Sequence, residues 1–140
     1  MLLLFFASLN IQAQVDKIIG KWNSIDDKTG EPRGVISIYL DDDGFYKGKI
    51  INLLEKNDQG EFVIMKEYPK EAEKAIGMVI LKDMKEKDNS LRGQCYDPES
   101  GNTYHGKITY DSETDQIILR GSIDKWGVLG RSQTWTRHKQ

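Results

Sequence analysis

The chain has 140 residues, a formal net charge of −2 and 38% hydrophobic residues. This length fits one domain with its own core, and the balanced charge excludes the basic excess typical of nucleic-acid-binding proteins. Cys95 is the single cysteine, which excludes an internal disulfide. The modest hydrophobic content is typical of sheets that have one solvated face.

The N-terminus resembles an export signal. Residues 1–13 carry no charge and are apolar from Leu2 to Leu9, which is too short for the roughly 20 residues that span a bilayer. The pattern predicts a signal peptide over 1–13, cleaved after Ala13, and a single domain over 14–140. A buried N-terminal strand is the alternative. Because Cys95 does not directly follow the apolar run, we expect no lipid anchor. Because the run is short, we expect no membrane span, and an exported chain then lies in the periplasm or outside the cell.

The rest of the chain consists of short alternating runs separated by turn residues. Many such strands commonly close into a barrel, because closure removes exposed edges. The fold class predicted is therefore all-β, a single antiparallel up-and-down barrel of about eight strands. The runs are 19–25, 35–40, 45–54, 78–82, 91–96, 103–110, 116–123 and 130–137.

Two hairpin registers place apolar residues on one face. The first opposes Leu40 with Tyr46, Ile38 with Gly48 and Ile36 with Ile50, leaving Ser37, Lys47 and Lys49 outside. The second opposes Tyr110 with Ile117, Ile108 with Leu119, Gly106 with Gly121 and Tyr104 with Ile123. Glycines that point inward on several strands suit the strong coiling of a small barrel.

The segment from Glu55 to Gly77 breaks the alternation. Pro69 is followed by good helix formers and ends at Gly77, which predicts a short helix of two turns in the middle loop. We expect this segment to cover one barrel mouth or to form a flap.

The first and last runs carry a candidate barrel closure. In a closed barrel these strands are neighbours, so Arg131 or Arg137 lies across the indole of Trp22, which follows Gly20. This arrangement resembles the calycin proteins, among them lipocalins and avidins. The alternative is that Trp22 is simply a large core residue.

A closer resemblance covers nearly all of the chain after the signal. The segments GKWNSIDDKTG, GVISIYLDDDGFYKGKI, AIGMVIL, LRGQCYDPESGNTYHGKI, ILRGSI and LGRSQTWTR resemble an exported bacterial family known as domain of unknown function 2147. The resemblance implies a calycin-like or streptavidin-like barrel in the cell envelope, with no assigned activity and no catalytic residue to transfer.

No pattern points to catalysis or to a metal. The hairpin register puts Cys95 inside and His105 outside, so they form no thiol–imidazole pair, and Cys95 is interpreted as a small buried residue. Asp41 to Gly44 lacks the spacing of a calcium loop and is interpreted as a hairpin turn. Asp97 to Gly101 is also interpreted as a turn. We expect no cofactor, no metal and no enzymatic activity.

The barrel lumen is the candidate site. Aromatic walls with one cation and one amide suit a small molecule with an apolar body and a polar or acidic head. The alternative is that these side chains fill the barrel. The predicted lining is Trp22, Tyr46, Tyr104, Tyr110, Arg131, Gln133 and Trp135.

Two functional hypotheses remain open. One is an envelope protein that binds a small amphipathic molecule in its lumen. The other is an interaction module that binds an envelope protein or cell-wall component through its outer surface, with Tyr39, Trp126 and the flap around Tyr68 as candidates. A filled lumen together with a contiguous exposed aromatic patch favours the second hypothesis.

Overall fold

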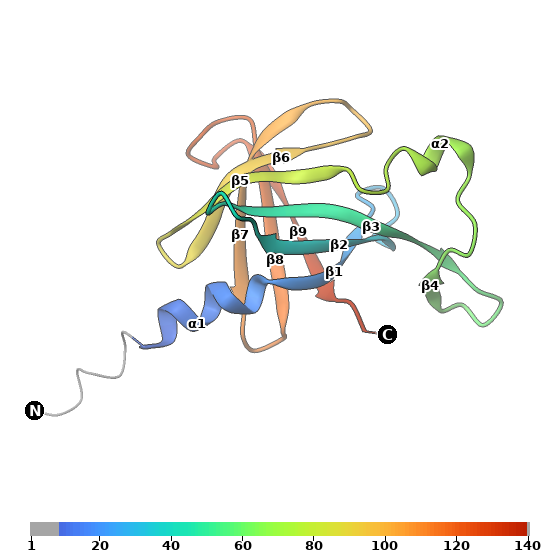
Figure 1. Cartoon of the computed structure of the whole chain (residues 1–140), viewed down its shortest axis with the longest axis horizontal. Coiled ribbons are helices and arrows are strands. Elements are labelled where there is room, and N and C mark those ends of the chain that lie inside the picture. Colours follow the sequence, from blue (N-terminus) through green and yellow to red (C-terminus); the bar gives the residue numbers. More distant parts are fainter. Residues whose placement is uncertain (1–8, 140) are drawn as a thin grey trace, which may run out of the picture.

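The computed structural model describes residues 9–139 of the chain, with side chains from residue 14 onward. Figure 1 shows strands β1, β2, β3 and β5 crossing in front of β7, β8 and β9 at a steep angle. The elements are α1 (Leu9–Ile18), β1 (Gly20–Ile25), β2 (Pro32–Leu40), β3 (Tyr46–Lys56), β4 (Phe62–Ile64), α2 (Lys70–Glu73), β5 (Val79–Lys87), β6 (Ser90–Tyr96), β7 (Thr103–Asp111), β8 (Gln116–Ser122) and β9 (Gly130–Arg137).

Eight of these strands close into the predicted barrel. Strand β1 pairs with both β2 and β9, and β2 also pairs with β3, so the circuit runs β1–β9–β8–β7–β6–β5–β3–β2 and returns to β1. Every pairing is antiparallel, and β4 adds to β3 outside the circuit. The all-β up-and-down barrel with a short helix in the middle loop is confirmed.

The alternation of inner and outer residues follows the predicted registers. All three predicted pairs of the β2–β3 hairpin are present, as are the first three of the β7–β8 hairpin. Ile36, Ile38 and Ile50 are buried, whereas Lys49 is exposed. Lys47 is half-buried on the outer face, where its Nζ lies 2.6 Å from an Asp41 Oδ and 2.7 Å from an Asp43 Oδ. Asp41 and Asp43 of this turn therefore form ion pairs with Lys47.

One barrel end is closed by α1, together with the β2–β3, β5–β6 and β7–β8 turns (Figure 1). Val15 and Ile18 of this helix are buried in the core. The helix was not predicted, and the predicted cleavage point after Ala13 falls within it. Most of the predicted signal, residues 1–8, lies outside the described residues. Among residues 9–139 no helix has the length and apolarity that a bilayer crossing needs.

The middle segment differs from its prediction in three respects. Helix α2 has one turn instead of two, and strand β4 was not predicted. The run expected to end at Lys82 continues as β5 to Lys87, past an irregularity at Asp83, whose φ is +52°. Ile76 and Met78 pack against the core, so the segment extends the barrel wall at the open end.

The predicted pair of Tyr104 with Ile123 is wrong. Strand β8 ends at Ser122, and Ile123 turns outward into the β8–β9 loop, where it is exposed.

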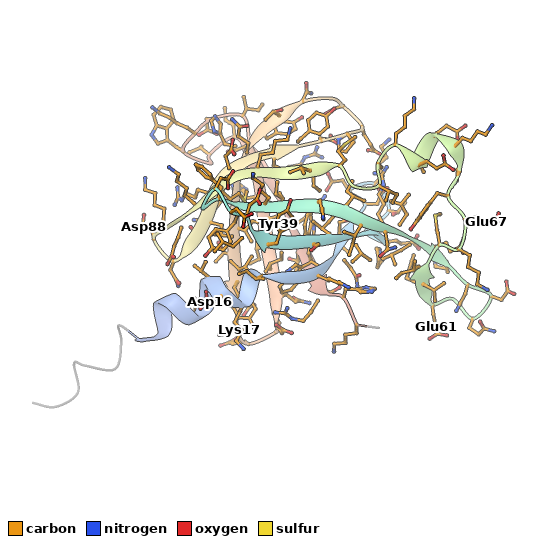
Figure 2. All side chains as sticks on the ribbon, viewed as in Figure 1. Asp16, Lys17, Tyr39, Glu61, Glu67 and Asp88 are labelled. Carbon is orange, nitrogen blue, oxygen red and sulfur yellow. The ribbon has the colours of Figure 1, made fainter. Side chains whose placement is uncertain are left out.

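Figure 2 shows that the acidic side chains labelled there lie at two extremes of the molecule. Asp88 is near the closed end, and Glu67 is on the segment that follows β4.

Candidate functional site

The structure divides the predicted lumen residues between the two ends of the barrel. Trp22 lies at the closed end, is fully buried, and donates its indole N–H to the Ile18 carbonyl at 2.8 Å. The Arg137 guanidinium lies 4.2 Å from the centre of the Trp22 rings. Protein groups therefore cover this indole, as expected for the barrel closure formed with Gly20.

Tyr46 and Tyr110 also belong to the closed end and pack against the core. The Tyr110 hydroxyl donates to Asp115 at 2.8 Å, and this hydrogen bond raises the pKa of Tyr110. Burial raises the pKa of Tyr46. Both rings act as parts of the closed end in this structure.

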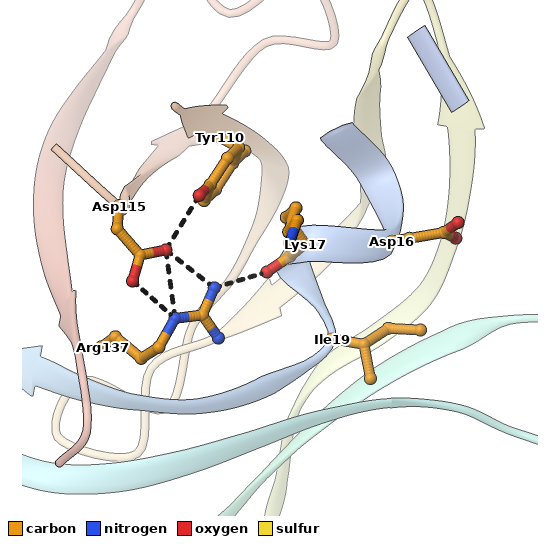
Figure 3. Close-up of a pocket in the computed structure, with 6 residues that line it drawn as sticks. All are labelled: Asp16, Lys17, Ile19, Tyr110, Asp115 and Arg137. Atoms are coloured by element: carbon orange, nitrogen blue, oxygen red, sulfur yellow. Dashed lines mark hydrogen bonds and ion pairs between the residues drawn. The ribbon is translucent and has the colours of Figure 1, made fainter. Parts of the chain in front are cut away.

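Asp115 and Arg137 form the polar centre of that end (Figure 3). Arg137 Nε lies 2.9 Å from one carboxylate oxygen and Nη2 lies 2.9 Å from the other, and Nη2 also donates to the Lys17 carbonyl at 2.9 Å. The guanidinium holds the pKa of the Asp115 carboxyl below its usual range. A cavity of about 350 Å³ lies beside this cluster, lined also by Asp16, Lys17 and Ile19. Because Arg137 hydrogen-bonds both Asp115 and Lys17 and stacks on Trp22, the cluster links α1, β9 and the β7–β8 turn.

Trp135, Gln133 and Arg131 follow one another along the inner face of β9 towards the open end. Trp135 is buried and donates its indole N–H to the Gln133 side-chain oxygen at 2.8 Å. The Gln133 amide donates in turn to Asp27 of the β1–β2 loop. Arg131 is exposed at the rim, opposite Gly121. Gln133 and Arg131 therefore belong to the open mouth.

Tyr104 completes the open mouth from β7. It is half-buried, and its hydroxyl accepts a hydrogen bond from the Asn102 amide at 3.4 Å. A side chain added at the inward-facing Gly121 would meet one atom within 4 Å, Tyr104 Cβ at 3.8 Å. Space therefore remains at the mouth between Tyr104 and β8.

Deeper in the barrel, side chains fill the lumen. Leu81 lies against Gly48, where an added Cβ would be 2.6 Å from Leu81 Cδ1, and Met84 lies against Gly106. Leu81 and Met84 are buried, as are Leu91 and Ile108. The inward glycines thus make room for large neighbours, which leaves the mouth as the accessible part of the predicted lumen site.

A second site, not predicted from the sequence, lies on the outer face of β5 to β8. Lys85 pairs with Arg92, Arg92 with Lys107, and Lys107 with Arg120, so four cations occupy neighbouring positions on four strands. We call these residues the cationic row. Within residues 9–139 no salt bridge joins a carboxylate to any of the four.

A groove of about 370 Å³ runs between this row and the β8–β9 loop. Arg92 Nε faces no hydrogen-bond partner among the described residues, although the atom is buried. The lining comprises Arg92, Gly93, His105, Gly106, Lys107, Arg120, Ser122, Lys125, Trp126 and Gly127.

The β8–β9 loop, residues 123–129, presents apolar side chains to solvent. Ile123 is 75% exposed, Trp126 75%, Val128 72% and Leu129 64%. We call these four residues the apolar loop cluster. It lies directly beside the cationic row, because Arg120 donates through Nε to the Gly127 carbonyl at 2.6 Å and through Nη2 to the Val128 carbonyl at 3.1 Å.

Cys95 and His105, the thiol and the imidazole of the described chain nearest in sequence, lie apart. Cys95 pairs with Tyr104 and Gln94 pairs with His105, so the thiol and the imidazole are on opposite faces, as predicted. Burial raises the pKa of the Cys95 thiol to about 11. No group of three or more His, Cys, Asp or Glu residues suited to a metal ion is found in the described part of the chain.

The closed barrel, sealed at one end by a helix and by an arginine stacked on tryptophan, is lipocalin-like. The solved structure of protein HP1028 from Helicobacter pylori, described as belonging to the lipocalin family, matches with a TM-score of 0.63. That match covers 86% of this chain and 82% of the other at 20% sequence identity, and it shows the fold. The family described as "Uncharacterized protein conserved in bacteria (DUF2147)" matches residues 20–137, and the chain belongs to this family. No curated protein matches the sequence.

Proposed function

We propose that this protein is a non-catalytic binding module of the bacterial cell envelope, which binds its target through its outer surface. The observation that carries the proposal is the apolar loop cluster beside the cationic row. Contiguous exposed apolar surface is rare on proteins without a partner, and cations placed side by side without carboxylates repel one another. A bound target relieves both costs.

The filled lumen supports this choice over a ligand deep in the barrel. Trp22 and Trp135 are buried and already donate their indole N–H groups to protein oxygens. The location in the envelope rests on the apolar, uncharged start of the chain. Val15 and Ile18 follow the predicted cleavage point, so the mature chain keeps these two core residues.

Sedimentation with isolated envelope tests the proposal. Purified protein is mixed with envelope from its own bacterium, and the bound fraction is compared with that of Trp126→Ser/Leu129→Ser, which removes two apolar groups from the exposed loop. The control, Lys70→Gln/Lys74→Gln, changes two exposed residues on and beside α2. We expect wild type and control to sediment and the loop variant to stay in solution. Equal sedimentation of loop variant and wild type, or no sedimentation at all, would overturn the proposal.

A second candidate function is the binding of a small amphipathic molecule at the barrel mouth. The space beside Gly121 and the polar groups of Tyr104, Gln133 and Arg131 favour it. Native mass spectrometry of protein purified from its own envelope tests this, with Gly121→Leu as the variant that fills the space. A retained molecule that Gly121→Leu loses supports the idea. Repeated ligand-free spectra, with no binding of fluorescent lipids, contradict it.

A further inference from the structure

We infer that the target of the outer surface is a phospholipid bilayer with anionic headgroups, into which the β8–β9 loop inserts while the cationic row binds lipid phosphates. This inference rests on the proposed function and names its target. It requires the loop to enter a medium poor in water, cations beside the loop, and other occupants to fit less well.

Several backbone groups of the loop are already hydrogen-bonded within the protein. Asp124 accepts the backbone N–H groups of Val128 at 3.0 Å and Leu129 at 2.7 Å, and its carbonyl accepts the Ser122 hydroxyl at 2.7 Å. The Ile123 N–H donates to the Leu129 carbonyl at 2.9 Å. Backbone groups that are already bonded do not lose hydrogen bonds on entering a membrane interface.

The same bonds hold the loop in one shape. Gly127 takes the φ of +79° that the tight turn requires, and Arg120 fixes two loop carbonyls from β8. The apolar loop cluster is therefore presented in advance, so binding does not have to order this segment first.

Trp126 is the side chain best suited to the interface. Its indole is largely exposed, and the Lys125 ammonium lies 4.8 Å from the centre of its rings. Tryptophan concentrates where headgroups meet acyl chains, because its ring is apolar and its N–H is polar. A lysine beside it faces the phosphates at the same depth.

The cationic row supplies the electrostatic half of the site: Lys85 and Lys107 are exposed, whereas Arg120 adds its charge while its guanidinium bonds the loop and Ser132. Like charges opposite one another across strands destabilise a sheet, and no carboxylate within residues 9–139 offsets them with a salt bridge. The buried, unpartnered Arg92 Nε lies at the groove that Trp126 borders. A phosphate is a strong acceptor for such donors, and each cation near an anionic surface adds to the attraction.

A second copy of the chain fits this surface less well. In a two-fold symmetric dimer the same patch meets itself, so the two cationic rows would face each other. A bilayer offers negative charge and an apolar interior side by side, which matches the order of cations and apolar side chains here. A protein with acidic and apolar groups is an alternative outcome of the test.

Vesicles of defined composition test the inference. We expect the full protein to sediment with vesicles of phosphatidylethanolamine and phosphatidylglycerol, and only weakly with phosphatidylcholine. Added salt should release it, because ions screen exposed charges. The chain has three tryptophans, of which Trp126 is exposed and Trp22 and Trp135 are buried. Lipid binding should therefore shift the emission of this one indole to the blue, and brominated acyl chains should quench it.

Three variants separate the two halves of the site. Trp126→Ser should weaken vesicle binding by at least about tenfold, from the lost burial of a large apolar side chain. Lys85→Gln/Lys107→Gln should weaken it by about fivefold for each charge removed. The control Lys70→Gln/Lys74→Gln should leave it unchanged. Circular dichroism establishes that each variant is folded.

Several outcomes would overturn the inference. These are equal binding to phosphatidylcholine and phosphatidylglycerol vesicles, equal binding of Trp126→Ser and wild type, and absence of vesicle binding. If envelope sedimentation persists and depends on the loop while lipid vesicles fail to bind, the target is a protein or a cell-wall component. The proposed function then stands without the membrane. Concentration-dependent dimers that Trp126→Ser abolishes would assign the surface to a second copy.

Discussion

Gly93 and Gly121 lie in one row across β6, β7 and β8, yet the structure predicts opposite effects of adding a methyl group to them. A Cβ at Gly93 would lie 2.6 Å from the Lys82 carbonyl oxygen and 2.8 Å from that of Asp83, both backbone atoms of β5. At Gly121 the nearest atom would be 3.8 Å away. Neither glycine has a positive φ, so the space available decides the outcome.

The expected magnitude follows from these distances. Non-bonded atoms sit comfortably about 3.5 Å or more apart, so β5 must move by about 1 Å to admit the methyl group of Gly93→Ala. Overpacking that shifts the backbone costs about 1–3 kcal/mol, and we expect the upper end because the obstacle is main chain. Gly121→Ala should instead gain about 0.5 kcal/mol, because alanine restricts the unfolded chain.

Urea unfolding followed by tryptophan fluorescence measures both free energies of unfolding. For Gly93→Ala a loss of about 3 kcal/mol corresponds to a melting temperature lower by about 10 °C. The reasoning is refuted if Gly93→Ala is as stable as wild type, or if Gly121→Ala loses as much stability as Gly93→Ala. The first result would mean that β5 and β6 do not approach each other as described, and the second that the space beside Gly121 and Tyr104 is filled.

Three further predictions concern other side chains. Arg137→Met should lower the free energy of unfolding by about 2–3 kcal/mol, because it removes the stacking on Trp22 and charged hydrogen bonds. The control Arg33→Gln, at an exposed ion pair, should lower it by less than about 1 kcal/mol. Equal losses in urea unfolding would contradict this prediction. Arg137 lowers the pKa of folded Asp115, so the stability that this pair contributes is present at neutral pH and lost as the pH falls through the folded pKa. Asp115→Asn should accordingly be less stable than wild type at neutral pH and equal to it in strong acid, and a difference independent of pH would argue against the ion pair. With its pKa raised to about 11, Cys95 should react with a disulfide reagent near pH 8 roughly 100-fold more slowly than in urea, and similar rates would show an open thiol.

Much of the barrel could be predicted because its hairpins alternate strictly. Where Ile36, Ile38 and Ile50 alternate with polar residues, one register buries all three, and this register is observed. The late hairpin follows the same rule as far as Gly121. Strand pairing in these segments depends on local pattern alone.

The missed elements are those in which the alternation is broken. A positive φ at Asp83 shifts the register of β5, so the alternation does not predict a strand beyond Lys82. Ile123 follows an alternating strand but belongs to a loop that Asp124 caps. The middle helix is shorter than its sequence indicates, because the chain returns to β3 at Gly77, whose N–H bonds the Ile50 carbonyl.

The candidate site was predicted only in part. Residues on the inner face were found, but inner position alone does not distinguish a ligand site from packing, and Trp22 and Trp135 prove to be packed. The cationic row has no local sequence pattern, because its four members lie on four different strands. The register predicted for 103–110 and 116–123 implies that Lys107 and Arg120 lie opposite each other on the outer face, and the pairing of β5, β6 and β7 adds the other two.

The meeting of β1 and β9 has a consequence for how the barrel fails. These strands share two paired positions, whereas β7 and β8 share seven. This junction has the fewest paired positions in the ring, and Arg137 of β9 reinforces it by lying over Trp22 of β1. If β1 and β9 separate, β9 exposes an unpaired strand edge, with Thr134, Trp135 and Thr136, to which other molecules can pair. The Arg137 guanidinium thus opposes strand exchange between molecules and aggregation, as well as unfolding.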